Sequence, residues 1–168
     1  TITGWTNLPE AGTKYFDART FGGNKYAYLS AFGTNANTVT TWLVTKGVNL
    51  DNTVNEVLNF KTMQGFINSG GVNVQSALKV LISTNYSGTG NPWDPAVTWT
   101  EITSQVALSP GNPTGSFPAT FTASGDVSLN GYSGTLYVAF RYEGSDPATT
   151  ANDKTSAWEI DDVRIYGF

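Results

Sequence analysis

The sequence predicts an all-β protein, an antiparallel β-sandwich of the jelly-roll type, and three observations lead to that prediction. Apolar and polar residues alternate with a period of two in most of the apolar segments. Clusters of Gly, Pro and Asn separate these segments at short intervals. No segment of helical length shows a continuous apolar stripe with a 3.6-residue period. We expect one sandwich domain over residues 1–168, with no linker and no second domain.

Eight segments fit the pattern of a β-strand, with many aromatic and β-branched residues. In chain order they are residues 25–31, 40–45, 57–63, 78–83, 99–102, 116–123, 135–142 and 158–165. Alternation predicts which side chains face the core in each strand. The expected inward-facing residues are Leu58, Phe60 and Thr62; Leu78, Val80 and Ile82; Phe117, Ala119 and Phe121; and Leu136, Val138, Phe140 and Tyr142.

The composition excludes several classes of function. The chain contains no His and no Cys. It therefore has no Ser-His-Asp triad, no imidazole or thiolate metal site and no disulfide. A formal charge of -4 and a sequence pI of about 4.6 argue against a nucleic-acid partner, which would require a basic face.

The polar residues are mostly uncharged. Only 13% of residues are charged, whereas Thr, Asn and Ser number 24, 15 and 13. This balance is typical of extracellular bacterial β-proteins, so we expect a secreted or cell-surface location. No apolar run approaches the roughly 18 residues of a membrane span, and we expect no membrane insertion. The chain begins at Thr1 without Met. We expect a module of a larger multidomain protein, monomeric because no apolar stripe requires a partner.

Six short motifs occur in an order that resembles the choice-of-anchor J and cleaved-adhesin group of domains, found mostly in secreted proteins of the Bacteroidota. The motifs are Tyr26–Phe32, Trp42–Thr45 with Val48–Leu50, Val57–Phe60, Leu78–Thr84 with Trp99–Ile102, Val138–Tyr142 and Trp158–Val163. The resemblance covers essentially the whole chain. One departure is that Lys46 follows Thr45 where the group commonly has Pro.

The resemblance implies a jelly roll of the galactose-binding-like type, often with a structural calcium ion. It also implies a non-catalytic accessory role, either in adhesion or in carbohydrate binding beside a secreted enzyme. Domains of one fold serve many partners, so the resemblance leaves the ligand open.

Asp161 is the residue most suggestive of a metal site. It is in phase with Val163 and Ile165, and a carboxylate buried beside them is costly unless it is paired or bound to a metal. Its neighbour Asp162 points to the other side of the strand. The alternative is that Asp161 caps backbone amides or pairs with an arginine, either Arg19 or Arg141.

The resemblance places the calcium ion where the last strand meets a loop near the N-terminus. Residues 17–24 match that loop, and their glycines would allow carbonyl groups to turn inward. We therefore expect structural Ca²⁺ held by Asp161, Asp17 and Asn24.

The loop formed by residues 85–95 is a first candidate ligand site. Its Gly and Pro content predicts a surface position, yet it contains Tyr86, Trp93 and Asp94. Aromatic rings stack on the C–H faces of sugars, and a carboxylate can bond to hydroxyl groups. The alternative is that Trp93 folds back as an apolar plug over the end of the sandwich.

A second candidate ligand surface combines polar side chains on the non-core side of several strands. These residues are Asn59, Lys61, Lys79, Tyr137, Arg141 and Glu143. We expect them to line the concave face of one sheet, where Arg and Lys would suit acidic or sulfated glycans. The alternative is an ordinary solvated sheet face.

These observations favour a non-catalytic carbohydrate-binding module of a secreted or surface polysaccharide-processing protein, with a polysaccharide as its partner. The alternative is an adhesin or structural spacer domain that binds a protein. A small glycan-cleaving enzyme is disfavoured, because the strand pattern brings no pair of carboxylates together in a cleft. We expect no enzymatic activity.

Overall fold

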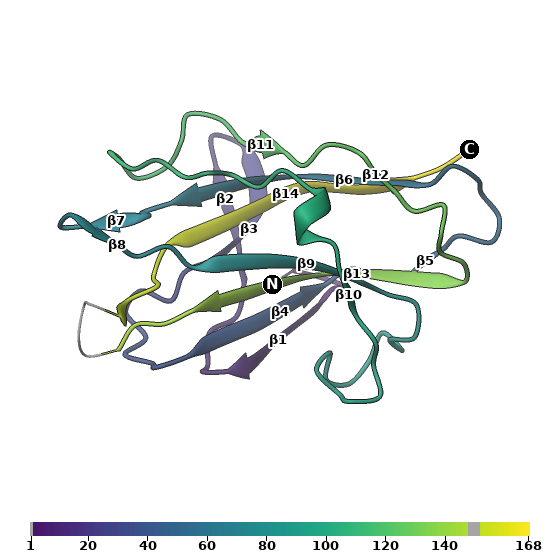
Figure 1. Cartoon of the computed structure of the whole chain (residues 1–168), viewed down its shortest axis with the longest axis horizontal. Helices are drawn as coiled ribbons and strands as arrows, with labels where there is room; N and C mark the ends of the chain where they lie inside the picture. The colour runs from purple at the N-terminus through teal and green to yellow at the C-terminus, as the bar shows by residue number, and fades with distance from the viewer. Residues whose placement is uncertain (1, 148–151) are drawn as a thin grey trace.

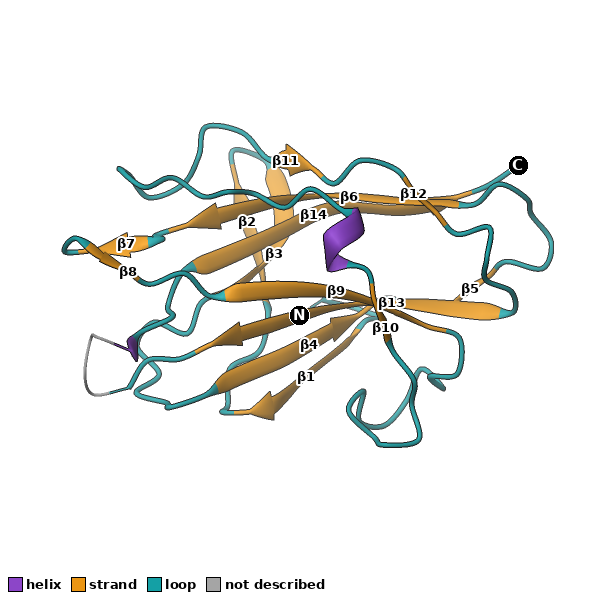
Figure 2. Cartoon of the chain, viewed as in Figure 1, coloured by secondary structure: helices purple, strands orange, loops and turns teal. Residues whose placement is uncertain are grey.

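The computed structural model describes residues 2–147 and 152–168, which form two stacked β-sheets (Figure 1). Loops connect the strands, and the 3₁₀ helix η1 (Thr103–Gln105) follows β10 (Figure 2). The strands are β1 (Thr6–Ala11), β2 (Asp17–Phe21), β3 (Asn24–Leu29), β4 (Val39–Val44), β5 (Val48–Asn49), β6 (Val57–Gly65), β7 (Asn68–Ser69), β8 (Val72–Asn73), β9 (Ala77–Ser83), β10 (Thr100–Glu101), β11 (Thr122–Ala123), β12 (Val127–Ser128), β13 (Thr135–Gly144) and β14 (Ala157–Tyr166). No helix in these two ranges is long and apolar enough to cross a membrane.

The two sheets are built from strands far apart in the chain. Sheet I has the order β1-β4-β13-β9-β10, and β5 also pairs with β13. Sheet II has the order β11-β6-β14-β3-β2, and β12 also pairs with β6. The strands β7 and β8 form a separate hairpin, and all of these pairings are antiparallel. The antiparallel sandwich predicted from the sequence is confirmed.

The core lies between the sheets and is filled mainly by alternate side chains of the longer strands β4, β6, β9 and β13, together with side chains of β3 and β14. Phe60 of β6 meets Phe140 of β13 edge to face, with ring centroids 5.0 Å apart. The inward phase predicted for three strands is confirmed, because Leu58, Phe60, Thr62, Leu78, Val80, Ile82, Leu136, Val138, Phe140 and Tyr142 are all buried. The residues between them face outward, where some are exposed and others, such as Leu81 and Ala139, are buried in a second apolar cluster.

A bulge in β14 changes the phase of the last strand. Asp161 pairs with Lys61, whereas Arg164 pairs with Asn59, so β14 has one extra residue here. Asp162 takes up the distortion with a φ of 50°. The predicted inward position of Asp161, in phase with Ile165, is therefore wrong: Ile165 packs against the core, and Asp161 faces outward and is half-buried.

Residues 17–24, predicted to be a loop, form most of a hairpin between β2 and β3. Its turn is Gly22-Gly23, with φ values of 58° and 83°. Two glycines with positive φ fit a two-residue turn whose twist matches that of the flanking strands. The hairpin adds β2 and β3 to the edge of sheet II and extends its outward face.

The strand predicted over residues 116–123 is also largely wrong, because only Thr122–Ala123 pairs with β6. Pro118 has no N–H to donate to a neighbouring strand. Phe117 does not enter the core, and its ring lies on the outward side of Gly65 in β6. The segment thus covers part of sheet II from outside.

Candidate functional site

The outward face of sheet II combines aromatic and hydrogen-bonding side chains from adjacent strands. The strand registers place Asp17, Tyr28, Glu159 and Met63 in one row across β2, β3, β14 and β6. In the next row, Arg19 of β2 lies opposite Tyr26 of β3. Asp161 of β14 lies opposite Lys61 of β6. Alternation in four strands therefore brings together side chains that are distant in the sequence.

A groove of about 610 Å³ lies on this face. We call it the central groove, and its lining includes Phe21, Asn24, Tyr26, Met63, Phe117, Phe121 and Glu159. Phe21, at the end of β2, is 79% exposed. The Tyr26 and Phe121 rings face each other at a centroid distance of 6.2 Å. The groove is therefore walled by aromatic rings from both edges of the sheet.

The position of Phe117 is fixed by its surroundings. The backbone N–H of Phe66 donates to the carbonyl of Ser116 at 2.6 Å, which ties the covering segment to the end of β6. The Phe66 and Phe117 rings meet edge to face at 5.2 Å. A methyl group on Gly65 would lie 2.5 Å from the Phe117 ring, so only glycine leaves room for this contact. The wall of the central groove is thus preorganised.

Glu159 is the one charged residue in the described lining of the central groove. The residue is 5% exposed, and burial raises the pKa of its carboxyl group. The nearby Tyr26 hydroxyl and the charge of Arg19 oppose that rise in pKa without cancelling it. Glu159 therefore places a fixed hydrogen-bonding carboxyl group among aromatic rings.

Arg19 lies beside the groove, and its guanidinium group already contacts Tyr28 and Asp17. Its guanidinium carbon lies 3.3 Å from the centroid of the Tyr28 ring, a cation–π contact, and it forms an ion pair with Asp17 at 3.6 Å. The charge of Arg19 is thus directed toward the sheet rather than toward a ligand in the central groove.

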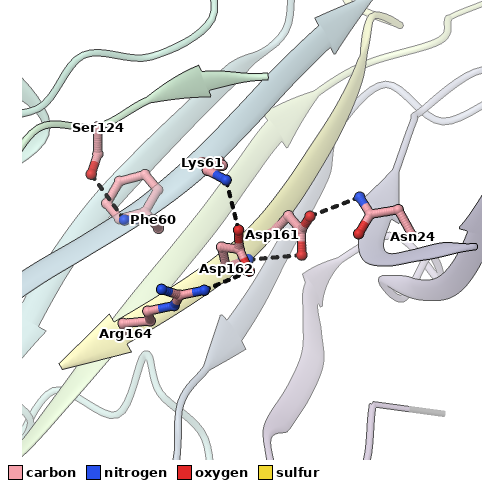
Figure 3. Close-up of polar contacts among 7 residues, drawn as sticks. All are labelled: Asn24, Phe60, Lys61, Ser124, Asp161, Asp162 and Arg164. Atoms are coloured by element: carbon pink, nitrogen blue, oxygen red, sulfur yellow. Dashed lines mark hydrogen bonds and ion pairs between the residues drawn. The ribbon is translucent and has the colours of Figure 1, made fainter. Parts of the chain in front are cut away.

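The expected calcium ligands are only partly brought together (Figure 3). Asn24 donates its amide N–H to Asp161 at 2.8 Å. Asp17 pairs with Tyr28 and lies four residues along β3 from Asn24, which is about 13 Å of extended strand. In the part of the chain that the structure describes, no three His, Cys, Asp or Glu residues are grouped to hold a metal ion. The three residues thus do not fit one calcium site, and calcium itself stays a prediction, to be tested by the effect of EDTA on the melting temperature.

Asp162 pairs with Lys61 on the neighbouring strand β6 and with Arg164 on its own strand β14. Lys61 donates to one of its oxygens at 2.7 Å and Arg164 to the other at 3.3 Å (Figure 3). These bonds, the one from Lys61 first, lower the pKa of the Asp162 carboxyl group. Lys61 is thus engaged with Asp162, and Asn59 donates to Asp126 at 3.0 Å.

The six residues predicted to share one sheet face are divided between two faces, which corrects that prediction. Asn59 and Lys61 belong to β6 in sheet II, whereas β9 and β13, which contain the other four, belong to sheet I. The predictions for Lys79, Tyr137, Arg141 and Glu143 as neighbours are consistent with the register of β9 and β13. The sequence could not show that β6 joins the opposite sheet.

The charged residues of sheet I neutralise one another. Arg141 bonds to Glu143 through its Nε at 2.8 Å, and its guanidinium carbon lies 5.0 Å from the Trp42 ring centroid. Lys79 lies 3.7 Å from both Glu143 and Glu101. This face therefore offers little unpaired positive charge to an acidic or sulfated glycan.

The loop of residues 85–95 folds back as the plug alternative predicted, but it packs against the outward side of sheet I rather than over the end of the sandwich. Tyr86 is 4% exposed and donates its hydroxyl to the carbonyl of Gly90 at 3.0 Å. Trp93 packs against the same apolar cluster as Tyr86, and Asp94 accepts a turn hydrogen bond from the Ala96 N–H at 2.8 Å. The expectation that Tyr86 contacts a ligand is wrong, because its ring is covered.

Sequence reasoning missed the groove residues Phe21, Tyr26, Phe117, Phe121 and Glu159. The position of Glu159 between the core residues Trp158 and Ile160 indicated an outward side chain, but not what would surround it. The aromatic wall depends on a covering segment that pairs with no strand along most of its length, and a period-two pattern cannot identify such a segment.

Comparison with solved structures identifies the fold. The K1 cleaved adhesin domain of Lys-gingipain from Porphyromonas gingivalis matches with a TM-score of 0.62 and 18% identity over 100% of this chain and 93% of that one. The K3 cleaved adhesin domain of the same protein matches with a TM-score of 0.56 and 20% identity, over 98% of this chain and 91% of that one. The module TmCBM61, in complex with β-1,4-galactotriose, matches with a TM-score of 0.51 and 11% identity, over 99% of this chain and 90% of that one. The predicted resemblance to cleaved-adhesin domains and the jelly-roll sandwich are confirmed.

Sequence comparison adds a family but no functional description. No curated protein matches the chain. The family DUF5017, described as a domain of unknown function, matches residues 46–166, which include every strand from β5 to β14. Because this match covers most of the chain, the protein belongs to the DUF5017 family.

Proposed function

We propose that this domain is a non-catalytic carbohydrate-binding module and that the central groove binds a neutral polysaccharide. The supporting observation is the groove itself, in which exposed or half-exposed rings surround the Glu159 carboxyl and Asn24 amide groups. Rings such as Phe21 and Phe121 offer flat apolar faces to the C–H groups of a sugar. The carboxyl and amide groups offer partners to its hydroxyl groups.

The charges favour a neutral glycan over an acidic or sulfated one. The cations that suggested acidic glycans are engaged elsewhere: Lys61 with Asp162, and Arg141 with Glu143. The groove itself contributes a carboxyl group, which would repel the carboxylate or sulfate of an acidic chain. A neutral sugar carries no charge for this carboxyl group to repel.

The fold comparison is consistent with this class of function. TmCBM61 was solved in complex with β-1,4-galactotriose, and it shares the sandwich with this chain at a TM-score of 0.51. We place the module in a secreted or cell-surface protein, where the polar, weakly charged composition fits.

Affinity electrophoresis on soluble neutral and acidic polysaccharides tests the proposal. We expect retardation by at least one neutral polysaccharide and none by sulfated ones. Phe21→Ala and Phe121→Ala should lower the affinity at least about tenfold, or ~1.4 kcal/mol. Phe168→Ala is the matched control, because Phe168 is 83% exposed and does not line the groove. Absence of retardation, or equal affinity of the Phe21 and Phe121 variants and the wild type, would refute the proposal.

The alternative function is an adhesin or spacer domain that binds a protein. The likeness to the K1 and K3 cleaved adhesin domains favours it. It predicts no retardation by any polysaccharide and measurable binding to a host or matrix protein, so the same experiment separates the two functions.

A further inference from the structure

A second cavity, of about 360 Å³, lies farther along the outward side of sheet II. Its lining includes Tyr28, Ser30, Phe32, Phe66, Asn68 and Ser69. On β3, Tyr28 continues the outward alternation of Asn24 and Tyr26, and Ser30 follows directly after the strand. The second cavity and the central groove therefore lie along the same strand.

The two cavities share an aromatic wall. Phe66 lines the second cavity and Phe117 lines the central groove, and their rings meet edge to face at 5.2 Å. Together the two cavities extend along β3 from Asn24 to Ser30. This distance is six residues, or about 20 Å of extended chain. This length exceeds any single sugar ring.

Two phenylalanine side chains at the second cavity are unusually exposed. Phe32 is 76% exposed and Phe66 is 49% exposed, so neither is needed to fill the core. Phe66 also has a φ of 56°, in the left-handed region that bulky residues rarely adopt. Two exposed aromatic residues beside a cavity, one of them with a strained backbone, favour a binding role.

The polar groups of the second cavity are hydroxyls and amides without charge. The lining that the structure describes contains no Asp, Glu, Lys or Arg. Asn68 and Ser69 lie on β7, both exposed, and within the described residues their side chains have no hydrogen-bond partner. Uncharged donors and acceptors between aromatic rings match the alternating hydroxyl and C–H surfaces of a neutral sugar.

The opposite end of the sheet differs in chemistry. Beyond the central groove, a smaller cavity of about 220 Å³ is lined by charged residues, among them Lys61, Asp162 and Arg164, which pair with one another. A neutral chain that leaves the central groove therefore meets suitable groups only toward Phe66 and Phe32.

We infer that the second cavity is an additional sugar subsite, and that the domain binds the interior of a linear neutral polysaccharide lying along β3. The chain extends from the central groove to the β7–β8 hairpin. This inference rests on the proposed function and deepens it, because it specifies a long linear chain rather than a terminal sugar.

Isothermal titration with β-1,4-linked gluco-, xylo-, manno- and galacto-oligosaccharides, each from dimer to hexamer, tests this inference. For the series that binds, we expect affinity to rise from dimer to hexamer by about tenfold or more. Phe32→Ala should remove most of that rise and leave the dimer affinity unchanged. Phe66→Ala should also remove the rise, and it should weaken dimer binding as well, because its ring packs against Phe117 of the central groove. Phe121→Ala should weaken dimer and hexamer alike, and Phe168→Ala should change neither.

The outcomes separate the two proposals. Dimer and hexamer binding with equal affinity, or a Phe32→Ala variant that keeps the full rise, would overturn the second subsite and leave the central groove supported. Because Phe32 follows β3 and is largely exposed, its truncation tests the subsite even if Phe66→Ala disturbs the fold. No binding in any of the four series would overturn the second subsite, and it would overturn the central groove as well if affinity electrophoresis also shows no retardation by any neutral polysaccharide.

Discussion

Glu159 is the residue whose ionisation should be most visible in the stability of the fold. Burial raises the pKa of its carboxyl group above the ordinary value of 4.5. Folding therefore favours the protonated form, and the stability from this group is lost as the pH rises from the ordinary pKa through the raised one. Glu159→Gln cannot ionise, and its amide oxygen remains a hydrogen-bond acceptor beside the Tyr26 hydroxyl.

We expect Glu159→Gln to melt at a higher temperature than the wild type at pH 7 to 8, with the difference shrinking below the ordinary pKa. Thermal unfolding of both proteins, measured from below the ordinary pKa of the carboxyl group up to pH 8, tests this expectation. Glu101→Gln is the control, because Glu101 lies on β10 of sheet I and is exposed. A Glu159 variant whose melting temperature follows the same pH curve as the wild type would contradict the burial argument.

Gly65, near the end of β6, determines whether the covering segment can lie on sheet II. A Cβ atom there would stand 2.5 Å from the Phe117 ring and 2.6 Å from the carbonyl oxygen of Ser116. Since that carbonyl accepts from Phe66 at 2.6 Å, it has little freedom to move. Gly65→Ala should therefore cost about 1–3 kcal/mol through overpacking.

For a chain of this length, each kcal/mol of lost stability lowers the melting temperature by roughly 2–4 °C. Calorimetry of Gly65→Ala measures it. Gly131→Ala provides the comparison, because a Cβ at Gly131 would meet no atom within 4 Å. Equal melting temperatures for the two variants would mean that the covering segment is not held against β6.

Across the sandwich, Tyr142 ties the two sheets together through its hydroxyl group. The side chain projects inward from β13 of sheet I and is fully buried, and burial raises its pKa to about 12. Its oxygen accepts from the Ala31 N–H at 2.9 Å and donates to the Ser156 carbonyl at 3.1 Å. Ala31 and Ser156 belong to the chain beside β3 and β14 of sheet II.

Tyr142→Phe leaves the buried Ala31 N–H without its partner and should cost about 1–3 kcal/mol. Urea unfolding monitored by tryptophan fluorescence gives this free energy. Tyr166→Phe, at a 41% exposed position, should change it by less than about 0.5 kcal/mol. If both variants unfold at the same urea concentration, the hydroxyl of Tyr142 does not link the sheets energetically.

Alternation predicted the strands and core of the sandwich because burial on one side imposes a period of two. Leu58 and Phe60 on β6, and Val138 and Phe140 on β13, follow this rule and are buried as expected. The same rule failed at Phe117, where an apolar residue covers a sheet from outside. A one-dimensional pattern marks a side chain as apolar, but it does not distinguish a core from an external wall.

The order of residues was sufficient to identify an antiparallel sandwich, the inward-facing side chains of three of its strands and the lack of imidazole and thiol chemistry. The assignment of strands to sheets was decided only by tertiary structure, and it separated Lys61 from Arg141. The bulge at Asp162 turned Asp161 outward, and the β2–β3 hairpin brought Phe21 and Tyr26 to the face that holds Glu159. These outcomes depend on pairing between distant segments, whose free energy comes from contacts that no local pattern contains.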